Sequence, residues 1–333
     1  MKKGDMHKVI NRRKLISYII VAIVLLSILL TFYGMNYYRN RFVNIGINSE
    51  EDIELFTEHF ALILEDIDSP FGEYIYEGAK AKGEELGIYI ENFGKNLPFS
   101  YSVKERLKMA IASGVNGIII QASNDEEMVD LINQASSSGI PVITVLDDAP
   151  LSERICFVGV NQYQLGKYYG NQILKNKDRE DAAIKTVIVL LDMNKTDKSL
   201  DLTFSAIKDT LSTSDIQVVA STIDRQSPFS SEETIHKIIM DEDNGPDIII
   251  CLNSADTISA YQTLVDYNKV GEIDIIGYYN QDIIESAIHK NIIDSTIVID
   301  TKQMGEYSVE ALNEYLTRGM VSEYISIDID ILE

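Results

Sequence analysis

Ten short apolar runs recur from Phe60 onward, and stretches of helical periodicity separate them. They are FALIL (60–64), IYIEN (88–92), GIIIQ (117–121), PVITV (141–145), ICFVGV (155–160), TVIVLL (186–191), IQVVA (216–220), DIIICL (247–252), IDIIGY (273–278) and STIVI (295–299). Most runs do not alternate with polar residues, so we expect both faces of each strand to be buried. Repeated strand–helix alternation predicts an α/β fold with parallel sheets covered by helices. For 333 residues, two sheets in two lobes are favoured over one sheet of ten strands.

A different kind of segment precedes these runs. Residues 15–34, LISYIIVAIVLLSILLTFYG, carry no charge over 20 residues, enough for a helix to cross a hydrocarbon core of about 30 Å. A cleaved signal peptide has a shorter apolar run and a small-x-small cleavage site, and a lipoprotein anchor needs a cysteine directly after the run, whereas the first cysteine is Cys156. We therefore expect a permanent transmembrane signal anchor in contact with membrane lipid.

The charges around the anchor predict its orientation. Six basic residues precede the apolar run and two follow it by residue 41, against one acidic residue, so residues 1–41 carry +7. This asymmetry favours a cytoplasmic N-terminus. We expect a cytoplasmic basic tail at 1–14, the anchor at 15–34, a juxtamembrane stalk at 35–57 and an extracellular domain at 58–333. The predicted localisation is therefore the cell membrane, with a single crossing.

Composition excludes several function classes. The chain carries −23 overall, so the part beyond residue 41 carries −23 − 7 = −30, and such acidity disfavours nucleic-acid binding. Two cysteines, Cys156 and Cys251, cannot build a disulfide framework, and no Cys/His cluster suits zinc. The motifs GxSxG, GxxxxGK[ST] and HExxH are absent. We expect no enzymatic activity, no cofactor and no metal.

The carboxyl ends of the predicted strands are where an open α/β sheet binds its ligand. After the first run, Asp66, Ser69 and Phe71 combine a carboxylate, a hydroxyl and an aromatic face. They are ligand candidates, although Asp68 or Ser69 is equally suited to cap the next helix. Gln121 ends the third run and is a further candidate.

Three later strand ends add polar and aromatic side chains. Asp147 and Asp148 follow the fourth run, and adjacent carboxylates there need solvent, a ligand or a partner such as Arg154. Asn253 follows the eighth run and can donate and accept at once, with helix capping as the alternative. Tyr279 and Asn280 follow the ninth run, where a tyrosine can stack on a ligand or pack between lobes.

From Phe60 to about Asp330 the chain resembles the type I periplasmic binding proteins of the ribose- and galactose-binding kind, here in a membrane-anchored form. The phrases that carry the resemblance occur in the family's order. They are SPFGEYIYEGAKAKGEELGI (69–88), GVNGIIIQASN (114–124), SGIPVITVLDD (138–148), FVGVNQYQLGKYYG (157–170), PDIIICLNSADTISAYQTL (246–264), IIGYYN (275–280) and QMGEYSVEAL (303–312).

The resemblance implies two lobes that close on a ligand about three crossings. These hinge crossings are expected near Asn161, Ile299 and Val321, each within four residues. Lobe 1 would then comprise about 58–161 and 300–321, and lobe 2 about 162–299 and 322–333.

The resemblance also implies site residues. The family's first-loop contacts fall on Ser69 and Phe71, and its asparagine after the eighth strand is retained as Asn253. Where the family has an Asp–Arg pair this chain has Asp147 and Asp148, and an arginine of the following lobe becomes about Asp201. With Tyr279 or Asn280 in place of an aspartate and Ile299 in place of a glutamine, the expected cleft is acidic and suits a sugar or an aminated ligand.

These features predict a membrane-tethered extracellular solute-binding protein, acting by lobe closure as the sensing component for a membrane partner such as a histidine kinase. The tail of about 14 residues is too short to be an output domain, which is why a partner is expected. The alternative is the substrate-binding subunit of an ABC-type sugar importer, which would use an identical cleft with a permease as its partner. An extracellular hydrolase is disfavoured because no nucleophile–base pair is visible.

Overall fold

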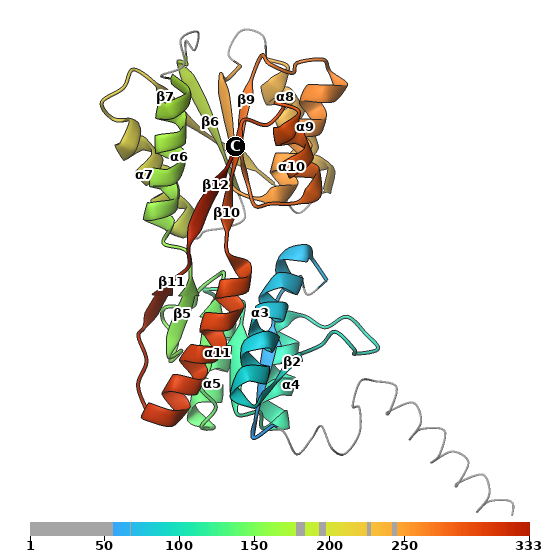
Figure 1. Cartoon of the computed structure of the whole chain (residues 1–333), viewed down its shortest axis with the longest axis vertical. Helices are drawn as coiled ribbons and strands as arrows, with labels where there is room; N and C mark the ends of the chain where they lie inside the picture. Colours follow the sequence, from blue (N-terminus) through green and yellow to red (C-terminus); the bar gives the residue numbers. More distant parts are fainter. Residues whose placement is uncertain (1–55, 67, 178–183, 193–197, 225–227, 242–244) are drawn as a thin grey trace, which may run out of the picture. The chain divides into compact units, whose positions relative to one another are not determined.

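The computed structural model describes residues 56–333 except 67, 178–183, 193–197, 225–227 and 242–244. The expected tail, the anchor and all but the last two residues of the stalk lie outside the described residues. Within the described part of the chain, no helix is long and apolar enough to cross a membrane. Residues Glu58–Glu333 form one compact unit, which contains two sheets and their helices (Figure 1).

The first sheet has six parallel strands and forms lobe 1. Its strand order is β11-β5-β4-β3-β1-β2. The strands are β1 (Glu58–Ile63), β2 (Ile88–Asn92), β3 (Gly117–Ile120), β4 (Val142–Val145), β5 (Cys156–Gly159) and β11 (Tyr324–Ser326). The helices of this lobe are α3 (Pro70–Leu86), α4 (Val103–Ser113), α5 (Glu126–Ser137) and α11 (Thr301–Arg318).

The second sheet has the same design and forms lobe 2. Its order is β12-β10-β9-β8-β6-β7, and β12 alone is antiparallel to its neighbour. The strands are β6 (Thr186–Asp192), β7 (Gln217–Ile223), β8 (Ile248–Cys251), β9 (Asp274–Tyr278), β10 (Ser295–Ile299) and β12 (Ile329–Leu332). The helices are α6 (Gln162–Lys177), α7 (Lys198–Leu211), α8 (Pro228–Ile239), α9 (Ser254–Asp266) and α10 (Asp282–His289).

All ten apolar runs of the sequence form strands. Every residue of β3, β4 and β8 is buried, as expected for parallel strands covered by helices on both faces. The sequence did not predict β11 and β12, which are short and half exposed. The two-lobed α/β prediction is therefore confirmed for the described residues.

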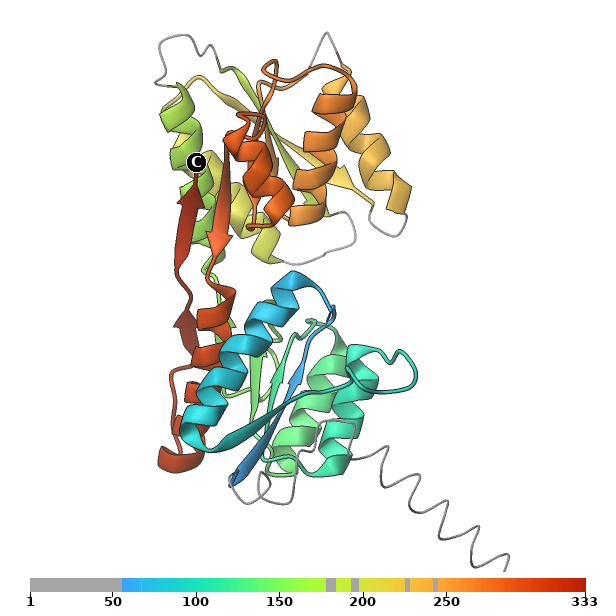
Figure 2. The same ribbon diagram turned by 45° about the vertical axis from the view of Figure 1, so that its right-hand side comes forward.

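Helices α3 and α11 lie side by side in both views of the molecule (Figures 1 and 2). Glycines permit this close approach: a Cβ atom on Gly305 would lie 2.0 Å from the Ile75 carbonyl oxygen, and one on Gly78 would lie 2.0 Å from the Lys302 carbonyl oxygen. Because α11 follows the second sheet in the chain, this contact fixes the returning segment onto lobe 1.

The chain passes between the lobes three times. It leaves the first sheet after Gly159 and begins α6 at Gln162, then leaves the second sheet after Ile299 and begins α11 at Thr301. These passages coincide with the positions expected near Asn161 and Ile299.

The third passage differs from the sequence prediction at Val321. The chain still pairs with β5 through β11 and reaches the second sheet only at Ile329. The Glu323 carbonyl oxygen accepts hydrogen bonds from the Phe157 amide at 2.9 Å and from Arg154 Nη1 at 3.2 Å. These contacts keep residues 322–326 on lobe 1, so the predicted boundary at Val321 is wrong and the crossing lies at 327–328.

The three crossings bond to one another. The Ile327 amide donates to the Gly159 carbonyl at 3.0 Å, and the Asp300 amide donates to the Asp328 carbonyl at 3.3 Å. The Gln303 side chain donates to Asp328 Oδ2 at 2.9 Å and accepts from the Asp328 amide at 3.0 Å. Movement between the lobes must therefore act on a connected set of strands rather than on three independent linkers.

Candidate functional site

Side chains at the carboxyl ends of strands in both sheets line a cavity of about 440 Å³. This volume lies within the range of roughly 300–1,000 Å³ that is usual for small-molecule sites. The residues that line it are Leu64, Glu65, Asp66, Ser69, Phe71, Gly72, Gln121, Leu146, Asp147, Gln162, Leu165, Thr203, Leu252, Asn253, Ser254, Tyr278, Tyr279 and Gln281.

Most of the residues predicted from the sequence line this cavity: Asp66, Ser69, Phe71, Gln121, Asp147, Asn253 and Tyr279. Asp148 and Asn280 do not line it. Asp201 belongs to α7, but the orientation of its side chain lies outside what the structure describes. The strand-end rule therefore found the cavity, and the structure shows which neighbours point elsewhere.

In lobe 1, the turn between β1 and α3 forms one wall. Ser69 is the N-cap of α3: its Oγ accepts a hydrogen bond from the Gly72 amide at 3.1 Å and donates to the Asp66 carbonyl at 2.8 Å. The capping reading of Ser69 is thus correct, and the residue also lines the cavity. Capping fixes the start of α3, and this places Phe71, the second residue of the helix, beside the cavity.

Gln121 connects three strand ends of the same lobe. Its Oε1 accepts from the Glu65 amide at 3.0 Å, and its Nε2 donates to Asp147 Oδ2 at 2.9 Å. The side chain therefore holds the loops after β1 and β4 together from its place after β3. Both ends of its amide are engaged, so Gln121 orients the carboxylate of Asp147 in addition to lining the cavity.

Arg106 supports this wall from behind, a role that the sequence did not reveal. The side chain is only 6% exposed, and its Nη2 donates to the Leu64 carbonyl oxygen at 2.6 Å. Its Nε has no hydrogen-bond partner among the described residues. Burial lowers the pKa of Arg106, and the charge of Glu65 partly opposes that effect. The partners are backbone carbonyls, which a sequence pattern cannot identify.

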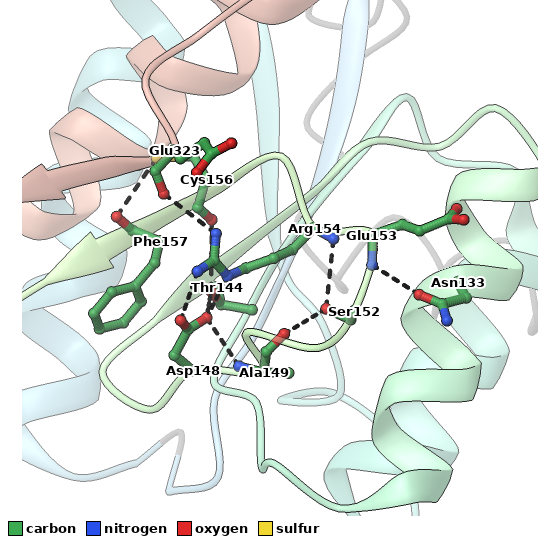
Figure 3. A network of polar contacts seen from close by, with 10 residues as sticks. All are labelled: Asn133, Thr144, Asp148, Ala149, Ser152, Glu153, Arg154, Cys156, Phe157 and Glu323. Carbon is green, nitrogen blue, oxygen red and sulfur yellow. Dashed lines mark hydrogen bonds and ion pairs between the residues drawn. The ribbon is translucent and has the colours of Figure 1, made fainter. Parts of the chain in front are cut away.

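Asp148 belongs to a separate network beside the cavity (Figure 3). It forms a two-pronged ion pair with Arg154, in which Nη2 lies 2.7 Å from Oδ2 and Nε contacts Oδ1. Thr144 Oγ1 and the Ala149 amide also donate to Oδ1, at 2.6 and 2.8 Å. Asp148 therefore does not line the cavity, and its carboxylate is held by partners within the protein instead of facing a ligand there.

In lobe 2, Asn253 is both a helix cap and a lining residue. Its Oδ1 accepts from the Asp256 amide at 2.8 Å, and its Nδ2 donates to Asp256 Oδ2 at 2.7 Å. Gln162 and Thr203 line the same side and bond to each other at 3.0 Å. Neither was among the predicted residues: Gln162 begins α6 just after β5 and the first crossing, and Thr203 lies within α7.

Two tyrosines end β9. Burial, followed by the charge of Asp147, raises the pKa of the Tyr278 hydroxyl. The Tyr279 ring packs on Phe71 with 4.4 Å between ring centroids. Asn280 is exposed and does not line the cavity, whereas its neighbour Tyr279 does. Tyr278, the other tyrosine of this strand end, lines the cavity as well.

The chemistry of the cavity is acidic and aromatic. Among the described residues that line it, Glu65, Asp66 and Asp147 are carboxylates and none is Lys, Arg or His. No group of three or more metal-ligating side chains occurs in the described part of the chain. Carboxylates, amides and hydroxyls around aromatic faces can bind a ring that carries hydroxyl groups, and they repel a phosphate or carboxylate.

Comparison with known proteins identifies the family to which this fold belongs. Residues 60–319 match the family model described as a periplasmic binding protein domain. No curated protein matches the chain.

Solved structures share this architecture. A glucose-galactose binding protein, GanP from Geobacillus stearothermophilus, is 23% identical with a TM-score of 0.72, and the match covers 83% of this chain and 97% of that one. A sugar-binding protein of a sugar ABC transporter from Bacillus halodurans is 21% identical over the same shares, with a TM-score of 0.71. A XylFII–LytSN complex matches at 21% identity and a TM-score of 0.68, again over 83% of this chain and 97% of the other.

Proposed function

Because the chain belongs to the type I periplasmic binding protein family, we propose that residues 58–333 bind a small polar molecule, in the first place a sugar, between their two lobes. The observation that carries this proposal is the cavity of about 440 Å³ at the carboxyl ends of strands from both sheets. A ligand there touches both lobes at once, so its binding free energy favours the arrangement in which both walls reach it.

The lining residues support a ligand rich in hydroxyl groups. The carboxylate of Asp147 can accept hydrogen bonds from adjacent hydroxyls, and Gln121 holds this carboxylate in place. Asn253 keeps a second amide hydrogen beyond the one it gives to Asp256. Phe71 offers an aromatic surface for the apolar face of a ring.

We also propose that a membrane anchor holds the binding domain at the cell surface. The uncharged segment 15–34 and its flanking charges support a single-pass anchor with the binding domain outside the cell. We propose that the protein senses its solute and presents the closed form to a membrane partner such as a histidine kinase. The solved complex of XylFII with LytSN supports a protein partner, and the relatives named as ABC transporter proteins support the alternative, a subunit of a sugar importer.

A ligand screen tests the binding function. The detergent-solubilised full chain is mixed with neutral monosaccharides, polyols, nucleosides, amines and amino acids, and its thermal unfolding is followed. A ligand at 100 times its dissociation constant stabilises the fold by about 2.7 kcal/mol. We expect a neutral monosaccharide to raise the midpoint, whereas a response to none of these classes would contradict solute binding.

The cavity assignment is tested with the hit from that screen. Asp147→Asn keeps the shape and the contact to Gln121 but removes the charge, and we expect at least a tenfold loss of affinity by calorimetric titration, because a hydrogen bond to a charged group contributes roughly 1.5–3 kcal/mol. Asn280→Ala, next to the cavity but outside it, serves as the control and should bind normally. If Asp147→Asn also binds normally, the ligand lies elsewhere.

Sensor and importer are separated in the native cell. The gene is deleted in cells that express their sugar-uptake genes constitutively. If the protein is a sensor, this constitutive deletion strain should take up the sugar normally. A second deletion strain, with normal regulation of the uptake genes, should lose sugar-dependent transcription. Loss of uptake in the constitutive strain would instead support the importer.

A further inference from the structure

Tyr279 has an unusual backbone at the cavity. Four non-glycine residues of the described chain have positive φ: Leu146, Asn268, Tyr279 and Asn291. Asparagine adopts this region readily, whereas leucine and tyrosine do so at a cost. Leu146 and Tyr279 are thus the two residues whose positive φ costs conformational free energy, and both line the cavity. Strained backbone of this kind clusters at functional sites.

The surrounding structure holds Tyr279 in this conformation. Its φ is 70°, its amide donates to the Ile297 carbonyl oxygen at 2.6 Å, and its own carbonyl accepts from Thr296 Oγ1 at 2.9 Å. Both partners lie on β10. The neighbouring strand therefore fixes the direction in which the tyrosine side chain leaves the backbone.

The side chain reaches from lobe 2 into lobe 1. Its ring lies 4.4 Å from that of Phe71 on α3, at an interplanar angle of 57°. Its hydroxyl lies 3.4 Å from Thr301 Oγ1 at the start of α11. Tyr279 is 4% exposed and Thr301 is also 4% exposed. One side chain thus contacts two helices of the opposite lobe.

These contacts place the ring between the cavity and the second crossing. Phe71 and Tyr279 line the cavity, whereas Thr301, on the far side of the tyrosine, does not. The ring therefore forms the end wall of the cavity on that side. Removing the ring would extend the cavity into the volume that the ring fills, toward Thr301.

We propose that Tyr279 determines ligand size: its ring closes the cavity toward the second crossing and restricts the site to single-ring solutes. This inference rests on the proposed function and deepens it.

Two substitutions distinguish the effect of the tyrosine ring from that of its hydroxyl group. Tyr279→Gly removes the wall and suits a φ of 70°, whereas Tyr279→Phe keeps the wall and loses only the contact to Thr301. Calorimetric titration of the full chain uses glucose, galactose, xylose, ribose and arabinose, and the disaccharides maltose, lactose, cellobiose and xylobiose. The control is Asn280→Ala.

We expect the ratio of disaccharide to monosaccharide affinity to rise at least tenfold in Tyr279→Gly and to stay unchanged in Tyr279→Phe and Asn280→Ala. An unchanged ratio in Tyr279→Gly overturns the proposal. If neither the wild type nor any variant binds a sugar, the sugar-binding proposal fails, and the wall is then tested without a ligand.

The ligand-free test uses a cysteine behind the wall. Cys156 and Cys251 are buried, and burial raises the pKa of the Cys156 thiol to about 11, so background labelling by a thiol reagent is slow. With Thr301→Cys added, we expect labelling at least tenfold faster in the Tyr279→Gly background than beside the native tyrosine or Tyr279→Phe. Circular dichroism confirms that each variant is folded. Equal labelling rates would show that the tyrosine ring does not close the cavity toward Thr301.

Discussion

At the residue scale, two adjacent carboxylates have different surroundings. Asp147 lines the cavity and accepts from Gln121, whereas Asp148 is paired with Arg154 and accepts from Thr144. The pair is largely buried, with side-chain exposures of 15% for Arg154 and 20% for Asp148. Removing one partner of such a pair leaves the other charge without compensation.

We therefore expect Asp148→Asn to destabilise the fold by up to about 3 kcal/mol and to leave ligand affinity within twofold. Chemical denaturation and calorimetric titration measure the two effects. Asp147→Asn should show the reverse pattern, so the neighbouring substitution is the matched control. If Asp148→Asn instead lost ligand affinity and kept wild-type stability, Asp148 would be a ligand-binding residue and the prediction would be wrong.

The same residues mark what a sequence can predict about a site. Strand-end position alone identified Asp147, Asn253 and Tyr279, because parallel strands bring their carboxyl ends to one edge. It could not separate Asp147 from Asp148, since that depends on which carboxylate meets Arg154. Arg106 was unpredictable for a related reason: its partners are carbonyl oxygens, whose positions appear only in the fold.

At the element scale, the contact between α3 and α11 depends on the absence of side chains. A Cβ on Gly305 would meet the Ile75 carbonyl oxygen at 2.0 Å and the Ala79 amide nitrogen at 2.6 Å. Both atoms are backbone, so they cannot rotate away as a side chain could. The helices would have to separate.

We expect Gly305→Ala to lower the free energy of unfolding by about 1–3 kcal/mol, the usual cost of overpacking, although alanine is the better helix former. Urea denaturation measures this. Leu316→Ala, at an exposed position of α11, is the control and should change stability by less than about 0.5 kcal/mol. A stabilised Gly305→Ala would mean that the helices can move apart freely.

Elements were predictable where their signal is local. Most of the ten apolar runs carry several buried residues, and all ten form strands, including β7, which has one buried residue in seven. β11 and β12 have only three and four residues, none of them fully buried, and become strands through pairing with β5 and β10. β11 pairs with β5, more than 160 residues earlier in the chain.

At the scale of the whole molecule, the last segment joins both lobes. β11 extends the first sheet and β12 extends the second, with Ile327 and Asp328 between them. The prediction of the third crossing at Val321 failed because backbone contacts at Glu323 hold the chain on lobe 1 for longer. The consequence is that each sheet ends in a strand of one continuous segment, which couples the stability of the two lobes.

This coupling predicts the effect of deleting residues 328–333 from the full chain. The deletion removes the four-residue ladder between β10 and β12, and at about 1 kcal/mol net for each hydrogen bond lobe 2 should lose roughly 3 kcal/mol. That loss corresponds to a fall of about 6–12 °C in its midpoint. Lobe 1 keeps β11, so we expect calorimetry to resolve two transitions for the deletion and a single transition for the intact chain. Deletion of Glu333 alone leaves the ladder and should preserve the single transition. A single transition in the longer deletion would show that α11 and the other two crossings couple the lobes without the C-terminal segment.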